Sequence, residues 1–373
     1  MRFFINYRFW LPLLILFGLE LTFGSGLYEP FVKGTSHSGV TIKIKEALKT
    51  IGHENVDYVT MGDSRADLGL DHRAISDIAS KFGKKHISIA MPGSHFTSFT
   101  VESDFLHKNF NNIKGVLLAI SSVSTTRIFN GYYELAIITP FKSYGDYSRI
   151  NKSIPFNINN IESYGLFSFL FQYRKDIEDF VTSPRQRIRG FHKEQPWMDV
   201  LAHRQYWTET LCSIDLETPE ACVDSVSRAM KSGGDMSSNS LNQYEKILMA
   251  CNEYGKSKNR VILPTGERAI RIRDSWLDLF RSLTFKKRPI VVLLPNSHFL
   301  YSYHFFDGID EWALSLLKPL AESNEIILLD YSRIFSSEDE CRYFYDPIHL
   351  NAAGAEVITK RLEPVLENYY QAD

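Results

Sequence analysis

Cysteine is scarce in this sequence: there are only four among 373 residues, and no two of them form a C-x-x-C pair. A structural zinc site of the paired-cysteine type is therefore not expected. An excess of charge of one sign is also lacking, since 42 lysines and arginines stand against 44 aspartates and glutamates. The chain has no overall basic field of the kind that attracts nucleic acid, so no nucleic-acid partner is expected.

Low hydrophobicity is absent too, and with it the main signature of a disordered chain. Apolar residues make up 44% of the sequence and charged residues 23%, which is ordinary for a globular protein. At roughly 150 residues per domain, the length predicts about two domains, or one domain that carries a large insertion.

Long apolar runs are missing except near the N-terminus, where one extends over residues 9–23. Arg2 and Arg8 precede this run, as in a secretory signal or signal anchor. The run is short against the roughly 20 residues of a full span. Residues 1–27 are therefore interpreted as a signal anchor, or alternatively as a signal peptide cleaved near residues 24–26 or as a buried core helix. Both targeting alternatives place the rest of the chain outside the cytoplasmic membrane, either anchored or secreted.

Strands and helices are expected to alternate in two parts of the chain that follow. After a linker and short helix in residues 28–55, the first part covers residues 56–123 and the second residues 289–373. Strands are predicted at residues 56–61, 86–90, 114–120, 290–294 and 326–329, and helices at residues 66–82, 97–109, 312–323 and 352–369. This alternation is typical of a parallel sheet covered by helices.

The alternation breaks between these parts, and residues 124–288 are interpreted as a partly helical insertion. Helices are predicted here at residues 161–181, 241–254 and 267–283. The basic segment 184–193 is read as a loop that is either solvated or in contact with an anionic polymer. Five aromatic side chains are expected to form the insertion's own core or to stack on sugars: Tyr132, Tyr133, Phe141, Tyr144 and Trp207. Cys212 and Cys222 are expected either to form a local disulfide or to remain unpaired.

Polar or glycine residues follow the predicted strands, where ligands bind in open parallel sheets. They are Ser64, Gly93, Ser121, Asn296, Asp346 and His349. Asp346 precedes His349 by one tight turn, so its carboxylate is expected to hold the Nδ1 proton and leave Nε2 as a base. Ser64 is the candidate nucleophile for that base. The alternative is that Asp63 or Ser64 merely caps a helix.

These residues resemble the motifs of the SGNH, or GDSL-like, hydrolase superfamily. Gly62-Asp63-Ser64 matches the first motif, Gly93 the second, and Asp346 with His349 the last. The resemblance covers residues 56–122 and 289–366. It implies a three-layer α/β/α, flavodoxin-like fold with a parallel five-stranded sheet, a Ser64-His349-Asp346 triad, and no cofactor or metal.

One family motif is not matched by this sequence. The family has an oxyanion-binding asparagine after the third strand, and no asparagine follows that strand here. The oxyanion hole is then expected to consist of the amides of Ser64 and Gly93, helped by Ser121 or Ser122. Asn296 is a candidate substrate contact. Arg65 is expected either to contact substrate or to form a surface salt bridge.

The chain is most similar to membrane-anchored periplasmic proteins of polysaccharide O-acetylation, of the alginate O-acetyltransferase type. This similarity implies a serine-dependent acyl, above all acetyl, transferase or esterase that acts on polysaccharide hydroxyls through an acyl-Ser64 intermediate. A multi-pass membrane acyltransferase is the implied partner. The alternative, which the missing asparagine supports, is an inactive partner protein in a polysaccharide assembly or acylation complex. The long insertion favours transfer over hydrolysis.

Overall fold

The computed structural model describes residues 7–34, 36–52, 55–126, 132–146, 150, 161–191, 207–232, 238–254, 262–302, 308–335 and 339–371. Its contacts divide the chain into two compact units. The first unit comprises Met1–Gly52, Gly93–Asn109 and Ile128–Met198, and the second, called the sheet unit, comprises His53–Pro92, Phe110–Arg127 and Asp199–Asp373. The predicted insertion, residues 124–288, is thus shared between the two units.

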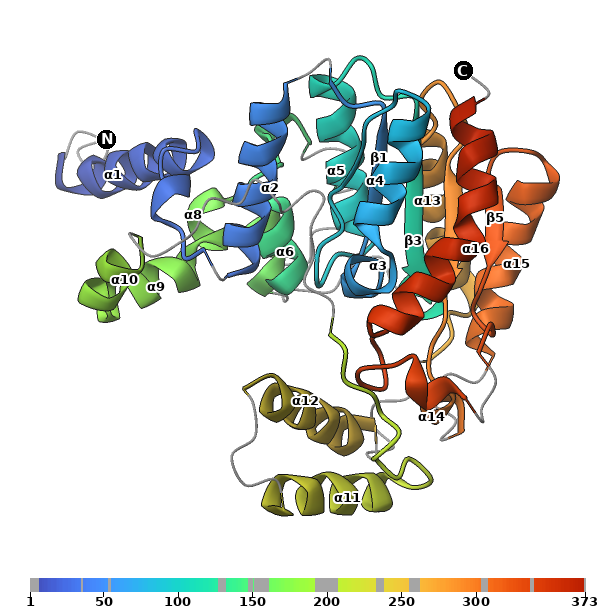
Figure 1. The fold of residues 1–373 in the computed structure, drawn as a ribbon. Helices are drawn as coiled ribbons and strands as arrows, with labels where there is room; N and C mark the ends of the chain where they lie inside the picture. Colours follow the sequence, from blue (N-terminus) through green and yellow to red (C-terminus); the bar gives the residue numbers. More distant parts are fainter. Residues whose placement is uncertain are drawn as a thin grey trace. The chain divides into compact units, whose positions relative to one another are not determined.

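The sheet unit is built on five parallel strands, which confirms the predicted parallel sheet (Figure 1). The strands are β1 (Tyr58–Gly62), β2 (His86–Ser88), β3 (Gly115–Ser121), β4 (Ile290–Leu294) and β5 (Ile327–Asp330). Their order is β2-β1-β3-β4-β5, the flavodoxin-like order. Tyr58 pairs with His86 on one side and with Gly115 on the other. Every residue of β1 to β4 is buried, as the largely apolar sequences of β1, β3 and β4 predict.

Helices cover both faces of this sheet and make the predicted three-layer α/β/α arrangement. One face carries α3 (Ser64–Gly69), α4 (His72–Lys81) and α16 (Ala352–Gln371), and the other α13 (Gly266–Ser282) and α15 (Ile309–Glu322) (Figure 1). Val292 of β4 and Ile358 of α16 belong to one buried cluster. The shorter or peripheral elements of the unit are η3 (Ser122–Thr126), α11 (Pro219–Ser232), α12 (Ser238–Tyr254), α14 (His298–Ser302) and η7 (Glu340–Arg342).

The single helix predicted for residues 66–82 is wrong, because two capped helices lie there. The Asp63 side chain accepts a hydrogen bond from the amide of Arg65 and begins α3. The Asp71 side chain accepts one from the amide of Ala74 and begins α4. Two aspartate caps so close together end one helix and start another, which the apolar periodicity alone did not reveal.

The first unit is mostly helical. Its elements are α1 (Tyr7–Gly24), η2 (Glu29–Phe31), α2 (His37–Ile51), α5 (Phe96–Asn109), α6 (Tyr132–Ile138), η4 (Tyr144–Asp146), η5 (Ile161–Leu166), α8 (Phe169–Gln172), α9 (Arg174–Thr182) and α10 (Pro184–Phe191). The continuous helix predicted over residues 161–181 is therefore wrong, since Ser168 caps a new helix within it. The loop predicted at residues 184–193 is also wrong over the length of α10, whose first residue is a proline.

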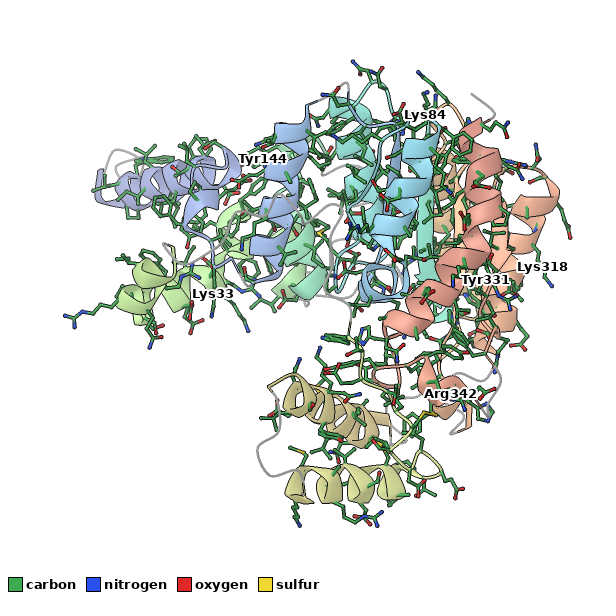
Figure 2. All side chains as sticks on the ribbon, in the orientation of Figure 1. Lys33, Lys84, Tyr144, Lys318, Tyr331 and Arg342 are labelled. Carbon is green, nitrogen blue, oxygen red and sulfur yellow. A yellow bond between two sulfur atoms is a disulfide. The ribbon has the colours of Figure 1, made fainter. Side chains whose placement is uncertain are left out.

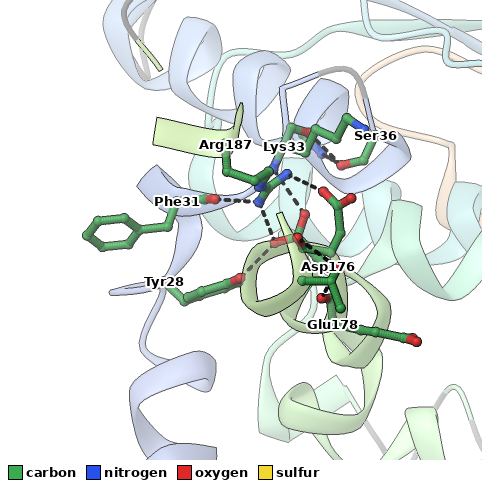
Figure 3. Close-up of polar contacts among 10 residues, drawn as sticks. Tyr28, Phe31, Lys33, Ser36, Asp176, Glu178 and Arg187 are labelled. Carbon is green, nitrogen blue, oxygen red and sulfur yellow. Dashed lines mark hydrogen bonds and ion pairs between the residues drawn. The ribbon is translucent and has the colours of Figure 1, made fainter. Parts of the chain in front are cut away.

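The basic segment is partly structural, as Figure 3 shows. Arg187 is buried and pairs with the Asp176 carboxylate at 2.9 Å. It also donates a hydrogen bond to the carbonyl oxygen of Phe31, and the Tyr28 hydroxyl donates to Asp176. This cation therefore joins α10 to the segment before α2, and it is neither solvated nor open to a polymer.

The C-terminal end of α1 is packed into the first unit. The Glu20 carboxylate accepts hydrogen bonds from the Ser168 hydroxyl and from the amides of Phe169 and Leu170. Phe23 is buried in a cluster with Phe169. In the part of the chain that the structure describes, no helix combines the length and hydropathy needed to traverse a bilayer.

The aromatic residues of the predicted insertion have different environments. Phe141 is buried, as the core interpretation predicts. Tyr144 is exposed and its hydroxyl donates to the carbonyl oxygen of Glu20. The side chains of Tyr132 and Tyr133 lie outside the described part of the structure. Trp207 belongs to the sheet unit and lies near His349.

Both expectations for Cys212 and Cys222 are wrong, because each pairs with a more distant cysteine. Cys212 is bonded to Cys341, 129 positions away, and Cys222 to Cys251, 29 positions away. The first bond joins segments that tertiary folding aligns, since the amide of Leu211 donates to the carbonyl oxygen of Cys341. The second clamps the hairpin of α11 and α12. No cysteine is free.

Candidate active site

The turn after β1 exposes the Ser64 hydroxyl at the end of the sheet. A Cβ on Gly62 would lie 2.2 Å from the Cβ of Ala66 and 2.4 Å from the carbonyl oxygen of Ala119, so only glycine allows α3 to begin this close to β3. Asp63 caps α3 and leaves Ser64 as its first residue, half-buried. The amide of a first helical residue has no carbonyl partner within its helix.

Ser64 lies at the position where open α/β sheets bind ligands. In the order β2-β1-β3-β4-β5, the chain changes its direction of winding between β1 and β3. The crevice at such a switch point, beyond the carboxyl ends of the strands, is the general ligand site of this architecture. Ser64 follows β1, and Ser121 is the last residue of β3.

A tight loop before α16 presents His349. Oδ1 of Asp346 accepts hydrogen bonds from the amides of Ile348 and His349, both at 2.8 Å, so the carboxylate closes the loop on itself. Asn351 then caps α16 by accepting a hydrogen bond from the amide of Gly354 at 3.1 Å. A Cβ on Gly354 would lie 2.4 Å from the carbonyl oxygen of Tyr343, which explains the glycine at this position.

Ser64, His349 and Asp346 form one hydrogen-bonded chain. His349 Nε2 lies 2.9 Å from the Ser64 hydroxyl oxygen, across 285 positions of sequence. His349 Nδ1 lies 2.8 Å from Oδ2 of Asp346 and 3.1 Å from its Oδ1. These contacts are within working hydrogen-bond distance for a nucleophile, its base and the group that orients the base. The structure therefore brings together the three residues that the sequence singled out.

The Asp346 carboxylate is held in its charged form. Burial by itself raises the pKa of this nearly inaccessible group, but the charge and hydrogen bond of His349 and the two loop amides outweigh burial. The net effect places the pKa of Asp346 below its ordinary value. A charged carboxylate at Nδ1 fixes the tautomer that leaves Nε2 free to accept a proton from Ser64.

Arg65 and Asn296 contact each other, and both are buried. Nη1 of Arg65 donates a hydrogen bond to Oδ1 of Asn296 at 2.7 Å. Within the described residues Arg65 forms no ion pair, so the predicted surface salt bridge is wrong. Proposed substrate contacts by this pair stay a prediction. What the structure shows is a link between the turn after β1 and the end of β4.

The predicted oxyanion donors differ in how the structure places them. The Ser121 hydroxyl lies 3.2 Å from that of Ser124, which in turn donates to Oδ2 of Asp63 at 3.1 Å, so Ser121 supports the cap of α3. Gly93 has the left-handed φ of 85° that suits glycine, but it belongs to the first unit. Its role beside Ser64 stays a prediction, and the amide of Ser64 is the one donor that the described turn itself provides.

Aromatic and basic side chains lie beside the triad, and of these only Trp207 was named from the sequence, as a core or sugar-stacking residue. Trp207 stacks on Tyr345 with ring centroids 3.8 Å apart, and it makes an edge-to-face contact with His349, with ring centroids 6.3 Å apart. Nζ of Lys246, on α12, lies 3.8 Å from the centroid of Trp207. Burial lowers the pKa of Lys246, and the nearby Asp346 charge opposes this shift. Tyr345 adjoins Asp346 in sequence, which was an available signal, whereas nothing in the sequence placed Lys246 here.

A small polar cavity lies next to Asn296, at the ends of β4 and β5. It measures about 30 Å³, and its lining residues are Pro295, Asn296, His298, Ser332, Arg333, Phe335 and Glu340. Glu340 accepts a hydrogen bond from the amide of His298, and burial raises its pKa to about 7. A space of this size holds one or two water molecules. It is too small for a sugar or an ester substrate.

Metal ligation and sequence relationships add no further assignment. Among the residues that the structure describes, no group of three histidine, cysteine, aspartate or glutamate side chains is arranged to hold a metal ion. No protein-family model matches the sequence, and no curated protein matches it significantly.

Proposed function

We propose that this protein is a serine-dependent acyltransferase or esterase of the SGNH type. The observation that carries the proposal is the contact of 2.9 Å between the Ser64 hydroxyl and His349 Nε2, made across 285 positions, with Asp346 on the other ring nitrogen. Chance capping of α3 explains Asp63 but gives no reason for a histidine on the Ser64 hydroxyl.

The proposed reaction begins with proton transfer from Ser64 to His349. The oxygen of Ser64 attacks an ester carbonyl while Nε2 takes its proton, and Asp346 stabilises the imidazolium that forms. The amide of Ser64 donates to the oxyanion, with Gly93 as the expected second donor. Collapse of the intermediate releases the alcohol, which takes the proton from His349, and leaves acyl-Ser64.

The acyl group then passes to a second nucleophile by the same steps in reverse. Either water or a polysaccharide hydroxyl gives its proton to His349 and attacks acyl-Ser64. We favour transfer of acetyl to a polysaccharide hydroxyl, with a multi-pass membrane acyltransferase as the supplier of acetyl groups. Transfer and hydrolysis are distinguished by the products formed from an activated acetyl ester. The yields of acetate and of acetylated sugar are compared with and without oligosaccharides. Acetate alone across a broad panel favours the esterase.

The test of the proposal is trapping of acyl-Ser64. The wild-type chain is incubated with p-nitrophenyl acetate, and the Ser64 peptide is examined by mass spectrometry for one acetyl group. Ser64→Ala is expected to lower nitrophenol release by about 1000-fold or more. Ser80→Ala, at an exposed serine of α4, is the matched control and is expected to leave the rate unchanged.

The second candidate is an inactive partner protein of a polysaccharide assembly or acylation complex. The observation that favours it is the lack of an asparagine after β3, together with the engagement of Ser121 by Ser124. Loss of an oxyanion donor costs about 100-fold to 1000-fold in rate where the donor is used. Equal rates for the wild type and Ser64→Ala, with no acetylated peptide, would establish this second candidate.

The proposed place of action is outside the cytoplasmic membrane, with α1 as the attachment. Two disulfides suit an oxidising compartment. Large apolar side chains of α1 between Trp10 and Leu21 are 40–62% exposed, and the Glu20 contacts hold the helix on the folded unit. Flotation of the full chain with lipid vesicles tests this attachment. The double change Leu14→Glu and Phe17→Glu is expected to abolish flotation, and Val181→Glu, at an exposed site of the same unit, to preserve it.

A further inference from the structure

The hairpin of α11 and α12 does not belong to the sheet or to the layers that cover it. It nevertheless contacts the loop of residues 345–351, which carries Asp346 and His349 and is called the catalytic loop. Gln243, on α12, is buried, and its side-chain amide donates to the carbonyl oxygens of Tyr345 at 2.8 Å and Thr210 at 3.2 Å. Lys246 lies three positions further on the same helix, hence on the same face. The hairpin thus holds the residue that directly precedes Asp346.

Trp207 joins this hairpin to the general base. Its ring stacks on Tyr345 and makes an edge-to-face contact with the His349 ring, and the Lys246 ammonium lies over the indole. Its carbonyl oxygen accepts a hydrogen bond from the amide of Ala352 at 2.7 Å, at the start of α16. Trp207 is therefore fixed at both its backbone and its ring, and its indole lies next to the imidazole.

Two disulfides restrain the segments that hold Trp207. The bond from Cys222 to Cys251 clamps the hairpin, and the bond from Cys212 to Cys341 ties the segment after Trp207 to the approach of the catalytic loop. An imidazole on a loop turns about its side-chain bonds unless neighbours restrict it, and a displacement of about 1 Å in a catalytic group costs on the order of 100-fold in rate.

We propose that Trp207 is a positioning residue for His349, and that the disulfide-clamped α11–α12 hairpin holds it there through Gln243, Tyr345 and Lys246. This inference rests on the proposed function of the triad. Trp207 acts through His349 and takes no proton, so its loss affects the rate of Ser64 acylation more than the binding of a small ester. Lys246 contributes by a cation–π contact with the Trp207 ring.

The experiment compares kcat and KM for p-nitrophenyl acetate in the full-length chain. Trp207→Leu is expected to lower kcat by about 10-fold to 100-fold and to leave KM within about twofold. Trp207→Phe retains an aromatic face and is expected to keep kcat within about threefold of the wild type. Trp10→Leu makes the same change at an exposed tryptophan of the other unit and is the matched control for stability and rate.

A second pair of variants tests the hairpin itself. Gln243→Leu removes the hydrogen bonds to the carbonyl oxygens of Tyr345 and Thr210 and is expected to lower kcat by about fivefold to tenfold. Asn242→Leu, at the exposed neighbouring position of α12, is expected to leave kcat unchanged. Thermal unfolding of every variant shows whether it is folded.

Three outcomes would overturn the inference. They are an unchanged kcat in folded Trp207→Leu, an equal loss of kcat in the Phe and Leu variants, and a rise in KM without a fall in kcat, which would make Trp207 a substrate contact. These three outcomes apply to the activity that depends on Ser64, that is, the activity that Ser64→Ala abolishes. Activity that survives Ser64→Ala instead rejects the proposed function and is thereby distinguished from failure of this inference.

Discussion

The Ser297 hydroxyl donates a hydrogen bond of 2.7 Å to the carbonyl oxygen of Pro347, between Asp346 and His349. Ser297 is fully buried just after β4, so the sheet itself holds the loop that carries the base. We predict that Ser297→Ala lowers kcat several-fold and the free energy of unfolding by about 1–3 kcal/mol, because a buried carbonyl loses its partner. Steady-state kinetics and urea unfolding measure both. Ser315→Ala, on α15, is the control. A wild-type kcat in Ser297→Ala would show that the loop needs no support from Ser297.

Asp346→Asn is predicted to fold and to lose activity by about 1000-fold to 10,000-fold, because an amide at this position favours the wrong imidazole tautomer. The lowered pKa of Asp346 also gives a stability prediction. A lowered pKa stabilises the folded state above the ordinary carboxyl pKa of about 4, and this contribution is lost as pH falls through the lowered value. The difference in unfolding free energy between wild type and variant should shrink below about pH 4. Asp77→Asn, on the exposed side of α4, should show neither effect.

Glu340 is predicted to have the opposite pH dependence. Burial raises its pKa from 4.5 to about 7, against the pull of the His298 and Phe299 amides and of Arg333. A raised pKa contributes stability that is complete below about 4.5 and lost as pH rises through about 7. Chemical unfolding should therefore show a smaller loss of stability for Glu340→Gln than for the wild type over this interval. Parallel curves for the two proteins would contradict the assignment, and the exposed Glu311→Gln is the control.

Gly62→Ala is predicted to destabilise the chain and to displace Ser64. The added Cβ would lie 2.2 Å from Ala66 and 2.4 Å from the Ala119 carbonyl oxygen, so α3 has to move away from β3. Overpacking of this kind costs about 1–3 kcal/mol. Thermal unfolding and the rate of Ser64 acylation measure the two effects. Gly69→Ala, whose nearest neighbour is a flexible leucine carbon at 3.3 Å, should be tolerated, and equal behaviour of both variants would refute the steric explanation.

The disulfide pairing is predicted to be Cys212–Cys341 and Cys222–Cys251 in the isolated protein. Denatured, unreduced protein should show no free thiol, and four should appear after reduction. Peptide mapping without reduction should recover both cross-linked pairs. The variant Cys212→Ser with Cys341→Ser is predicted to lose about 2–5 kcal/mol of stability, because its loop is long. Recovery of a Cys212–Cys222 peptide would reject this pairing.

The strands of the sheet were predictable because each is a short apolar run that ends at a polar or glycine residue. The same local chemistry identified Gly62-Asp63-Ser64 and the turn from Asp346 to His349. Where two helix caps lay close together, as at Asp63 and Asp71, periodicity alone failed, since it does not register a cap within an apolar repeat.

What the sequence by itself determined was therefore the parallel α/β class and the identity of the candidate nucleophile, its candidate base and the carboxylate that contacts that base. Only the tertiary structure decided which cysteines pair, that Arg65 turns to Asn296, and that Trp207 lies against His349. Those contacts join segments whose separation in the chain carries no information about their distance in space. Local hydrogen bonds and apolar spacing act over a few residues and can be read directly, whereas long-range pairs depend on how the packed layers bring the loops together.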